Sequence, residues 1–448
     1  MVQTPKGMHD LLPEELKCMD KIVEKAKEIA EFYEFLPIKT PHLEHLELFS
    51  RPLGETSDVI EKQMYTLRTR GGDQLALRPE GTAPIMRAYH QNGMKSLPQP
   101  VKFYYEGAFF RHENPQRGRA REFRQFGLEI LGDGDAVLDA EIIKIFYLAL
   151  TELGFSAKGG SAGGGKNPIV HINSIGDKNC RPNYKKELGN YYKKKFNYLC
   201  KDCKRRFKDN PLRMLDCKEE SCIELKAGSP QMISHLCEEC KIHFKNVLEF
   251  LDEGKIPYLL DNYLVRGFDY YSRTVFEIFI GEDGTNEEKN INKNEEEKIS
   301  SQPIALGGGG RYDELSSMLG GKSVPAVGGS LGLERIAHEM KGAGLAPEEK
   351  NAPGIFLIHI GPAAKKRTFT LMEELRDAGI KAGESISRDN LKTQLNIASK
   401  IGAKFALILG QKEAMDGTIL IRDMETGVQE SALQIKLVEK IKAKLKKK

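Results

Sequence analysis

A long strand that ends at an arginine, followed by a basic turn and a returning strand, constrains the fold of this 448-residue chain more than any other segment. Residues 101–110 are apolar and aromatic in the manner of a β-strand, and Arg111 follows them directly. The turn 114–121 carries three arginines, and Gln125 and Glu129 would share one face of the strand beyond it, because side chains alternate along a strand. The pattern is typical of a rigid hairpin that offers a guanidinium to phosphate oxygens, although a charged surface hairpin is the simpler alternative.

Around this hairpin, helices and strands follow one another in irregular order. The expected elements are helices over 14–36, 82–92 and 135–153 and strands over 64–67, 75–77 and 169–173. Such an order favours an α+β core over a regularly alternating parallel sheet.

The chain divides into three expected domains. A core covers 1–177 and 256–345, and a basic, cysteine-bearing inserted domain at 178–255 interrupts it. Residues 352–448 have the pattern of a small α/β unit that a helix closes, with Leu433, Leu437, Ile441 and Leu445 on one side of that helix. Two polar loops, 158–166 and 281–301, are expected to be flexible connectors.

Seven of the eight cysteines lie in the inserted domain, and six of them form two C-x2-C pairs and one C-x4-C pair (Cys217 and Cys222). Paired C-x2-C spacing is typical of tetrahedral zinc sites, whereas free thiols are the alternative. The best four candidate ligands are Cys200, Cys203, Cys237 and Cys240.

Residues 78–82 (RPEGT) follow an expected strand and precede an expected helix. Glu80 could pair with the ammonium group of a substrate, with Gly81 and Thr82 beside it. The structural alternative is that Glu80 or Thr82 caps the helix N-terminus.

Residues 264–271 (LVRGFDYY) place Arg266 before a glycine in a segment otherwise prone to β-structure, which would let a ligand approach closely. Tyr270 and Tyr271 would point to opposite faces of a continuing strand, so one of them could line a pocket. Arg335, in the first turn of a helix after a glycine-rich strand, would add its charge to the helix dipole and favour a phosphate. A core strand and a helix salt bridge are the alternatives.

The formal net charge is only +4, so any contact with nucleic acid must come from local patches. The chain has no apolar run of the roughly 20 residues that cross a bilayer, and its first residues have no apolar signal core. We therefore expect a cytoplasmic protein without a membrane partner.

Taken together, these motifs resemble class II aminoacyl-tRNA synthetases, and specifically the histidyl-tRNA synthetase family, nearly from end to end. The segments that carry the resemblance are 40–58, 110–129 and 328–335 for the class, 264–271 and 305–312 for histidine, and 352–448 for an anticodon-binding domain. Phe268 stands where leucine is usual, and the cysteine-rich insertion occurs in only part of the family.

The resemblance implies an α+β fold with an antiparallel catalytic sheet flanked by helices, an inserted helical domain and a C-terminal α/β anticodon-binding domain. It implies a homodimer that uses ATP and Mg²⁺ to convert L-histidine into histidyl-adenylate. The enzyme would then transfer histidine to the 3′ end of tRNA-His.

The resemblance also implies a role for each candidate residue. Arg111 and Arg266 would be catalytic, by holding the α-phosphate. ATP would contact Arg111, Glu113, Arg119 and Arg335. Histidine would contact Glu80, Gly81, Thr82, Gln125, Glu129, Tyr270 and Tyr271.

Three alternatives share parts of this pattern. A non-catalytic regulatory subunit of ATP phosphoribosyltransferase would typically lack the anticodon-binding domain and an intact Arg266 segment, and this chain has both. An RNA-binding regulator with a dead site would not need Arg111, Arg266, Arg335, Glu80 and Glu129, all of which are present. A synthetase for proline, threonine or glycine would not carry residues 264–271.

Overall fold

The computed structural model describes residues 2–53, 59–114, 118–156, 167–281, 304–347 and 353–447. The chain forms two compact units, Met1–Pro347 and Glu348–Lys448. The predicted loop 158–166, nearly all of the predicted loop 281–301 and residues 54–58 of the first motif lie outside the described residues.

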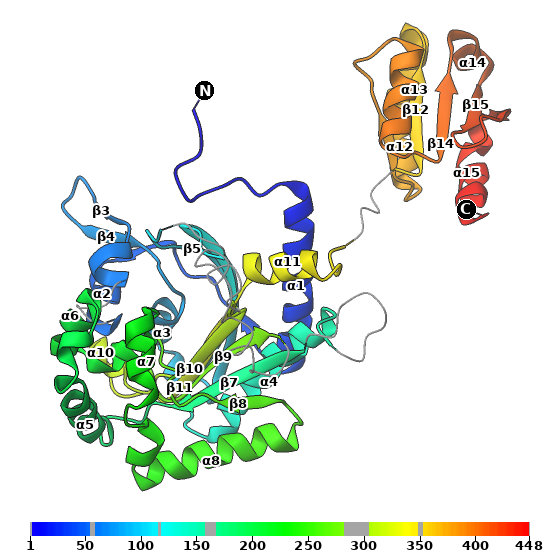
Figure 1. Ribbon diagram of the computed structural model, residues 1–448. Coiled ribbons are helices and arrows are strands. Elements are labelled where there is room, and N and C mark those ends of the chain that lie inside the picture. The colour runs from blue at the N-terminus through cyan, green and yellow to red at the C-terminus, as the bar shows by residue number, and fades with distance from the viewer. Residues whose placement is uncertain are drawn as a thin grey trace. The chain divides into compact units, whose positions relative to one another are not determined.

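An eight-stranded sheet forms the centre of the first unit (Figure 1). Its strands, in order across the sheet, are β1 (Leu36–Pro37), β5 (Val101–Phe110), β6 (Glu122–Leu131), β11 (Ala326–Gly332), β10 (Gly307–Arg311), β9 (Ser272–Ile280), β7 (Pro168–Ser174) and β8 (Tyr258–Leu260). Neighbours pair antiparallel, except that β1 with β5 and β7 with β8 pair parallel. The predicted α+β class with an antiparallel core is confirmed.

The hairpin of β5 and β6 is the longest pairing in this sheet. It runs from Val101 opposite Leu131 to Phe110 opposite Glu122. Strand β5 has the bounds that the sequence predicts, because the alternation of apolar and aromatic residues persists until Arg111 leaves the sheet.

Four helices share one hydrophobic core with the sheet: α1 (Pro13–Phe32), α4 (Ala136–Glu152), α8 (Glu238–Glu253) and α11 (Leu333–Gly342). The first helix ends four residues before the predicted limit of 36. Glu34 adopts a left-handed φ of 65°, which turns the chain out of the helix and into β1.

A second core lies between the sheet and a smaller layer. The layer contains β2 (Leu43–His45), α2 (Glu47–Leu53), the short turns Val59–Gln63 and Met94–Ser96, β3 (Thr66–Arg68), β4 (Gln74–Leu77), α3 (Thr82–Gln91) and α10 (Leu315–Met318). Besides Tyr89, four buried tyrosines belong to this core: Tyr105, Tyr270, Tyr271 and Tyr312. Their hydroxyl groups bring polarity into this layer and mark where the site lies.

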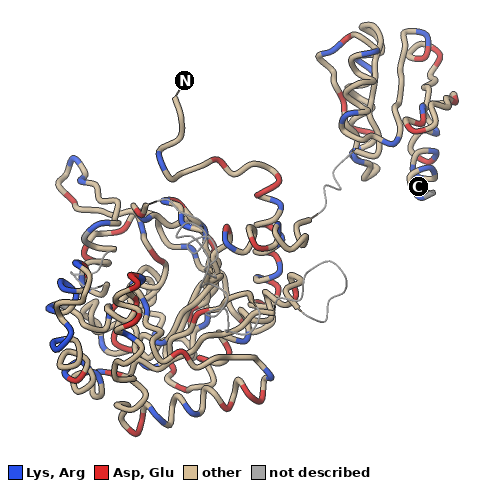
Figure 2. The backbone as a smooth tube through the Cα atoms, in the orientation of Figure 1, with Lys and Arg blue, Asp and Glu red and all other residues tan. Residues whose placement is uncertain are grey.

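The inserted block is helical, as predicted. It contains α5 (Arg181–Lys193), α6 (Lys201–Asp209), α7 (Glu220–Ala227) and the short turns Phe196–Tyr198, Pro211–Asp216 and Met232–His235. These elements enclose a core of their own, whereas α8 packs back onto the main core through Phe244, Val247 and Leu251. Lysines and arginines colour much of α5 and α6 in Figure 2, which agrees with the basic character of the block.

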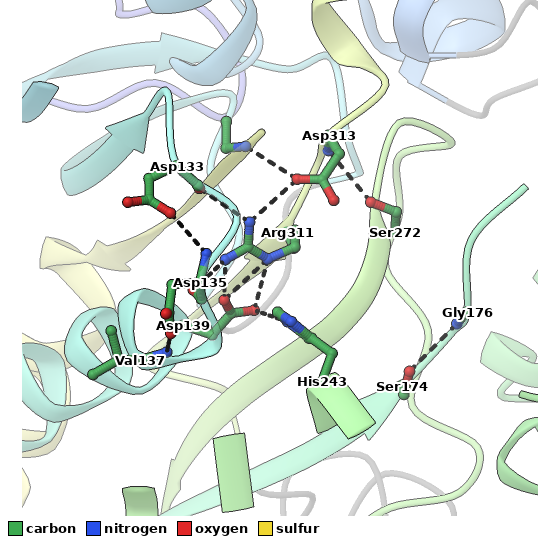
Figure 3. Close-up of polar contacts among 11 residues, drawn as sticks. Asp133, Asp135, Val137, Asp139, Ser174, Gly176, His243, Ser272, Arg311 and Asp313 are labelled. Atoms are coloured by element: carbon green, nitrogen blue, oxygen red, sulfur yellow. Dashed lines mark hydrogen bonds and ion pairs between the residues drawn. The ribbon is translucent and has the colours of Figure 1, made fainter. Parts of the chain in front are cut away.

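A buried ion-pair network joins the sheet to the start of α4 (Figure 3). The Arg311 guanidinium, 0% exposed, donates to both carboxylate oxygens of Asp139, with a distance of 3.0 Å from Nε to Oδ2. His243 Nε2 lies 3.4 Å from the same carboxylate, and Arg311 also donates to the carbonyl oxygen of Asp135 at 2.9 Å. The network fixes the end of β10, directly before Tyr312.

The second unit has a five-stranded sheet in the order β13 (Ala382–Glu384), β12 (Ile355–His359), β14 (Phe405–Leu409), β15 (Thr418–Asp423) and β16 (Gln429–Leu433). Its helices are α12 (Pro362–Asp377), α13 (Leu391–Lys400), α14 (Gln411–Asp416) and α15 (Leu437–Lys447), with a short turn at Gln434–Lys436. The predicted α/β character is confirmed. Leu433 ends β16 and is half-exposed, so its predicted place on the closing helix is wrong.

None of the helices among the described residues is long and apolar enough to cross a membrane.

Candidate active site

A cavity of about 1090 Å³ opens on the face of the sheet that carries the tyrosines. Eleven of the twelve candidate site residues line it: Glu80, Gly81, Thr82, Arg111, Glu113, Arg119, Gln125, Arg266, Tyr270, Tyr271 and Arg335. Glu129 is the exception, because its side chain is fully buried behind the wall. The structure therefore brings together residues from five separate segments of the sequence.

Arg111 lies at the mouth of the hairpin, where two aromatic rings and a backbone group fix its guanidinium. Its Nε donates to the carbonyl oxygen of Pro79 at 2.9 Å, and the guanidinium carbon lies 5.1 Å from the centre of the Phe123 ring and 5.4 Å from that of Phe268. Stacked and held in this way, the group is preorganised for a planar, anionic partner. Burial lowers the pKa of Arg111, and the nearby Arg266 lowers it further, while Glu113 opposes both.

Two more guanidinium groups approach the same part of the cavity. Arg335 donates to the carbonyl oxygens of Gly118 and Ala305, at 2.8 Å each, and Arg119 pairs with Glu113 at 3.1 Å. Burial lowers the pKa of Arg335, and the positive charges of Arg119 and Arg111 lower it further. This mutual repulsion shows that the arginines form one positively charged cluster, which a polyphosphate would relieve.

Arg266 faces this cluster from the loop that precedes β9. Its Nη1 bonds Glu277 at 2.5 Å, and its guanidinium carbon lies 5.6 Å from the centre of the Tyr271 ring. Nε is buried and has no hydrogen-bond partner among the described residues. Although burial disfavours the charge, Tyr271 and Glu277 outweigh it and raise the pKa of Arg266, so the group is always cationic.

Residues 264–271 form a turn-containing loop rather than a strand, and β9 begins only at Ser272. In consequence Tyr270 and Tyr271 do not point to opposite faces. Both line the cavity, and their ring centres are 4.7 Å apart. The glycine-rich strand β10 leaves room for this loop, since a Cβ on Gly308 would stand 2.8 Å from Nη1 of Arg266.

Two further carboxyl groups belong to the site: Glu80 lines the cavity, and Glu129 is buried behind its wall. Glu80 accepts the N–H groups of Thr82 at 2.7 Å and Ala83 at 2.9 Å, so its carboxylate caps the first turn of α3, although the N-cap residue is Gly81 and neither Glu80 nor Thr82. The same carboxylate also accepts the hydroxyl of Tyr270 at 3.3 Å and faces the cavity. Capping therefore places Glu80 in the site, and burial raises its pKa.

Glu129 lies beneath Glu80 and accepts two side-chain hydroxyl groups. Thr82 donates to Oε1 at 2.7 Å, and Tyr312 donates to Oε2. Burial raises the pKa of Glu129 to about 8, although these hydrogen bonds oppose the shift. Gly328, opposite Glu129 in the sheet, makes room for the carboxylate, because a Cβ there would stand 1.8 Å from Oε2.

Three residues of the site have no role in the sequence-based prediction: Tyr105, Tyr312 and Glu277. The ring of Tyr105 lies between Gly81 and Gly127, whose added Cβ atoms would stand 2.6 and 2.1 Å from Cζ. Two small residues from distant segments thus make the slot for one ring. No local pattern could reveal this, whereas Tyr312 follows a glycine run that the sequence does mark.

The predicted zinc ligand set is wrong. The structure separates Cys200 and Cys203 from Cys237 and Cys240, and places each pair with other partners. The first pair lies with Cys217 and Cys222, and the second with Asp177 and Cys180. The reason is that the two pairs lie at the starts of two different helices, α6 and α8, and each helix start packs against other segments of the chain.

The antiparallel sheet and the hairpin with its arginine at the edge of a large cavity define a class II aminoacyl-tRNA synthetase. A profile of the family "Histidyl-tRNA synthetase" matches residues 7–158 and 228–336, and a profile of the "Anticodon binding domain" matches 355–444. The chain belongs to the histidyl-tRNA synthetase family.

Individual relatives agree with this assignment over nearly the whole chain. A histidine–tRNA ligase of Desulforamulus reducens is 38% identical over 440 residues, covering 98% of this chain and 99% of that protein. One of Pelotomaculum thermopropionicum is 40% identical over 425 residues, covering 95% of this chain and 94% of that protein. The crystal structure of apo S. aureus histidyl-tRNA synthetase matches with a TM-score of 0.76 at 30% identity, covering 99% of this chain and all 100% of that one.

Proposed function

We propose that the cavity is the active site with which this chain acts as a histidine–tRNA ligase, the enzyme that joins histidine to its tRNA. One observation carries the proposal: four guanidinium groups converge on a cavity that Glu80 lines and behind whose wall Glu129 is buried. A polyphosphate suits the arginines, and a small cationic amino acid suits the carboxyl groups.

In the first step, a carboxylate oxygen of histidine attacks the α-phosphorus of ATP, and the bond to the leaving pyrophosphate breaks. Arg111 and Arg266 would hold the α-phosphate from opposite sides and stabilise the charge that develops there. Arg119 and Arg335 would hold the β- and γ-phosphates. These residues accelerate the reaction by position and charge, without a covalent enzyme intermediate.

The ATP that enters would carry Mg²⁺. Glu113 fits this ion, since its carboxylate lines the cavity beside Arg119 and Mg²⁺ prefers oxygen ligands. When bound, the ion would neutralise part of the polyphosphate charge and help pyrophosphate to leave.

Histidine would bind at the carboxyl groups of Glu80 and Glu129. Glu80 would accept its α-ammonium group, with Gly81, Thr82 and Gln125 beside it on the wall. Its imidazole N–H would replace the Thr82 hydroxyl as a donor to Glu129, and Tyr271 would contact the other ring nitrogen. A pocket with polar groups for both ring nitrogens rejects apolar side chains, which would leave these groups unpaired.

In the second step, a hydroxyl of the terminal tRNA adenosine attacks the adenylate carbonyl and releases AMP. The basic turn 116–121, part of which lies outside the described residues, would meet the acceptor end of tRNA-His. Residues 355–444, which match the anticodon-binding profile, would contact the anticodon. We further propose that the enzyme is a cytoplasmic homodimer, which sedimentation of the purified protein would test.

The regulatory-subunit alternative has less support. A solved structure named as an ATP phosphoribosyltransferase regulatory subunit/histidyl-tRNA synthetase, from Bacillus halodurans C, matches with a TM-score of 0.60 at 21% identity, which shows the shared fold alone. This chain retains Arg266 inside the cavity and a complete second unit.

The exchange of pyrophosphate into ATP, measured with each of the twenty amino acids, tests the proposal. We expect exchange with histidine only. Exchange with another amino acid, or with none, would refute the assigned roles.

A further inference from the structure

Two separate groups of metal-ligand side chains lie in the insertion and at its start. We call Cys200, Cys203, Cys217 and Cys222 the tetrathiolate cluster, and Asp177, Cys180, Cys237 and Cys240 the mixed cluster. In each cluster the four ligand atoms all lie within 4.8 Å of one another. We infer that these are two separate metal sites, each of which binds one Zn²⁺, in place of the single site that cysteine spacing predicts.

The sulfur–sulfur distances fit a shared metal ion. Four sulfurs bound to zinc at about 2.3 Å stand about 3.8 Å apart, at the corners of a tetrahedron. Sγ of Cys200 lies 3.8 Å from Sγ of Cys217, and Sγ of Cys180 lies 3.9 Å from Cys237 and 3.7 Å from Cys240. A disulfide needs about 2.05 Å, and all eight cysteines are free of one.

The backbone around each cluster favours thiolates. Cys200 caps the N-terminus of α6, where its Sγ accepts the N–H of Cys203 at 3.4 Å, and its own N–H donates to Sγ of Cys222 at 3.4 Å. In the mixed cluster, Cys237 precedes α8 and the N–H of Asp177 donates to Sγ of Cys180 at 3.3 Å. Helix N-termini and N–H···S bonds both stabilise a deprotonated, metal-bound sulfur.

The insertion also needs a source of stability besides its apolar core. Five of the 13 buried residues of that core are cysteines, and only eight larger side chains, four leucines, two methionines and two tyrosines, complete it. Small cores of this kind are commonly stabilised by a structural metal. Free thiols at the same positions would add only modest packing.

The ligand types select the metal. Tetrahedral thiolate sites take Zn²⁺ or iron, and thiolates alone would also suit Cu(I). The carboxylate of Asp177, 3.2 Å from Sγ of Cys180, is a hard oxygen ligand that disfavours Cu(I) in the mixed cluster. Zn²⁺ is the ion that both clusters accept.

The two sites attach the insertion to the loop that carries Arg266. In the mixed cluster, Asp177 and Cys180 lie at the entry of the insertion and the other two ligands at its exit, so one ion would tie the two ends together. Arg181, which follows Cys180, donates to the carbonyl oxygen of Tyr271.

The tetrathiolate cluster reaches the same loop through the turn Pro211–Asp216, which leads into Cys217. From this turn, Arg213 donates to the carbonyl oxygen of Gly267 at 2.9 Å and to Asp269 at 3.0 Å. Arg213 and Arg181 are therefore positioning residues, and the metal ions would hold them in place.

Metal analysis of the full-length protein, purified without chelators, tests the inference. We expect about two zinc ions per chain in the wild type. Cys217→Ser and Cys180→Ser should each retain about one zinc ion per chain, and the variant with both substitutions should retain none. Cys18→Ser is the control and should retain about two, because Cys18 lies in the main core, away from both clusters. One zinc or fewer in the wild type, or no loss in either single variant, would overturn it, as would iron in place of zinc.

X-ray absorption at the zinc edge needs no variant and stands even if the serine variants do not fold. The two ligand sets contain seven sulfurs and one oxygen. We expect a first shell dominated by sulfur at about 2.3 Å, with a minor oxygen contribution. A shell of mainly nitrogen and oxygen would show adventitious zinc and overturn the inference.

Discussion

Replacement of Arg266 tests the assignment of the catalytic arginines most directly. In the structure, Glu277 and the Tyr271 ring fix this guanidinium before any substrate arrives. A charge that is held in place needs no reorganisation when negative charge develops on the α-phosphate. Removal of one such preorganised donor typically lowers kcat by about 10²- to 10³-fold, which corresponds to about 3–4 kcal/mol of transition-state stabilisation.

We therefore expect Arg266→Ala to lower the rate of histidine-dependent pyrophosphate exchange by about 10²- to 10³-fold. The KM for ATP should change much less, because the interaction acts mainly in the transition state. Arg266→Lys should have an exchange rate between those of the wild type and Arg266→Ala, since a lysine keeps the charge but not the planar fork.

Two further variants separate charge from position. Glu277→Gln leaves the guanidinium but removes its anionic anchor, and we expect a smaller loss, about tenfold. Arg376→Ala removes an exposed arginine of the second unit and should leave exchange unchanged. Circular dichroism and thermal melting check that every variant is folded. An exchange rate for a folded Arg266→Ala within about threefold of the wild type would refute the reasoning.

Three other predictions concern Glu129 and the buried network. Glu129→Gln should raise the KM for histidine by about 10- to 100-fold and leave the KM for ATP nearly unchanged, because an amide NH2 replaces one of the two carboxyl oxygens in the histidine pocket only; equal effects on both would exclude Glu129 from that pocket. Gly328→Ala should likewise raise the histidine KM, because its Cβ would stand 1.8 Å from a Glu129 oxygen, whereas Gly342→Ala, whose Cβ would meet nothing within 4 Å, should behave as the wild type; equal histidine KM values for the two variants would contradict the expected clash. Burial alone would raise the pKa of Asp139, but Arg311 outweighs it and lowers the pKa to about 2. The ion pair therefore contributes its full stabilisation, about 2 kcal/mol, above the unfolded pKa of about 3.9, and this stabilisation is lost as the pH falls through about 2. Unfolding measured as a function of acid pH should show this loss in the wild type and not in Asp139→Asn.

Much of the fold follows from local patterns that the sequence displays. Strand β5 has its predicted bounds, since the β-propensity of such a run depends on neighbouring residues alone. The prediction failed where a backbone turn overrode the pattern, as at Glu34, and where short elements such as β13 carry too few residues to form one.

The candidate site could be predicted as a set of residues but not as an arrangement. The arginines are conspicuous because each lies close to a glycine or at the end of a strand, and all of them line the cavity. The burial of Glu129, its bond to Tyr312 and the slot for Tyr105 depend on strands that meet only in the folded sheet.

The sequence by itself determined which side chains are present and which local elements carry them, because strand and helix periodicity are written into short stretches of chain. Only the tertiary structure decided which of them meet. The cysteines show this most clearly: spacing joins Cys200 with Cys203 and Cys237 with Cys240, yet the partners of each pair come from segments 14 to 60 residues away, through Cys217 and Cys180. Contacts over such distances arise when whole helices and turns pack together, and no short stretch of sequence contains that information.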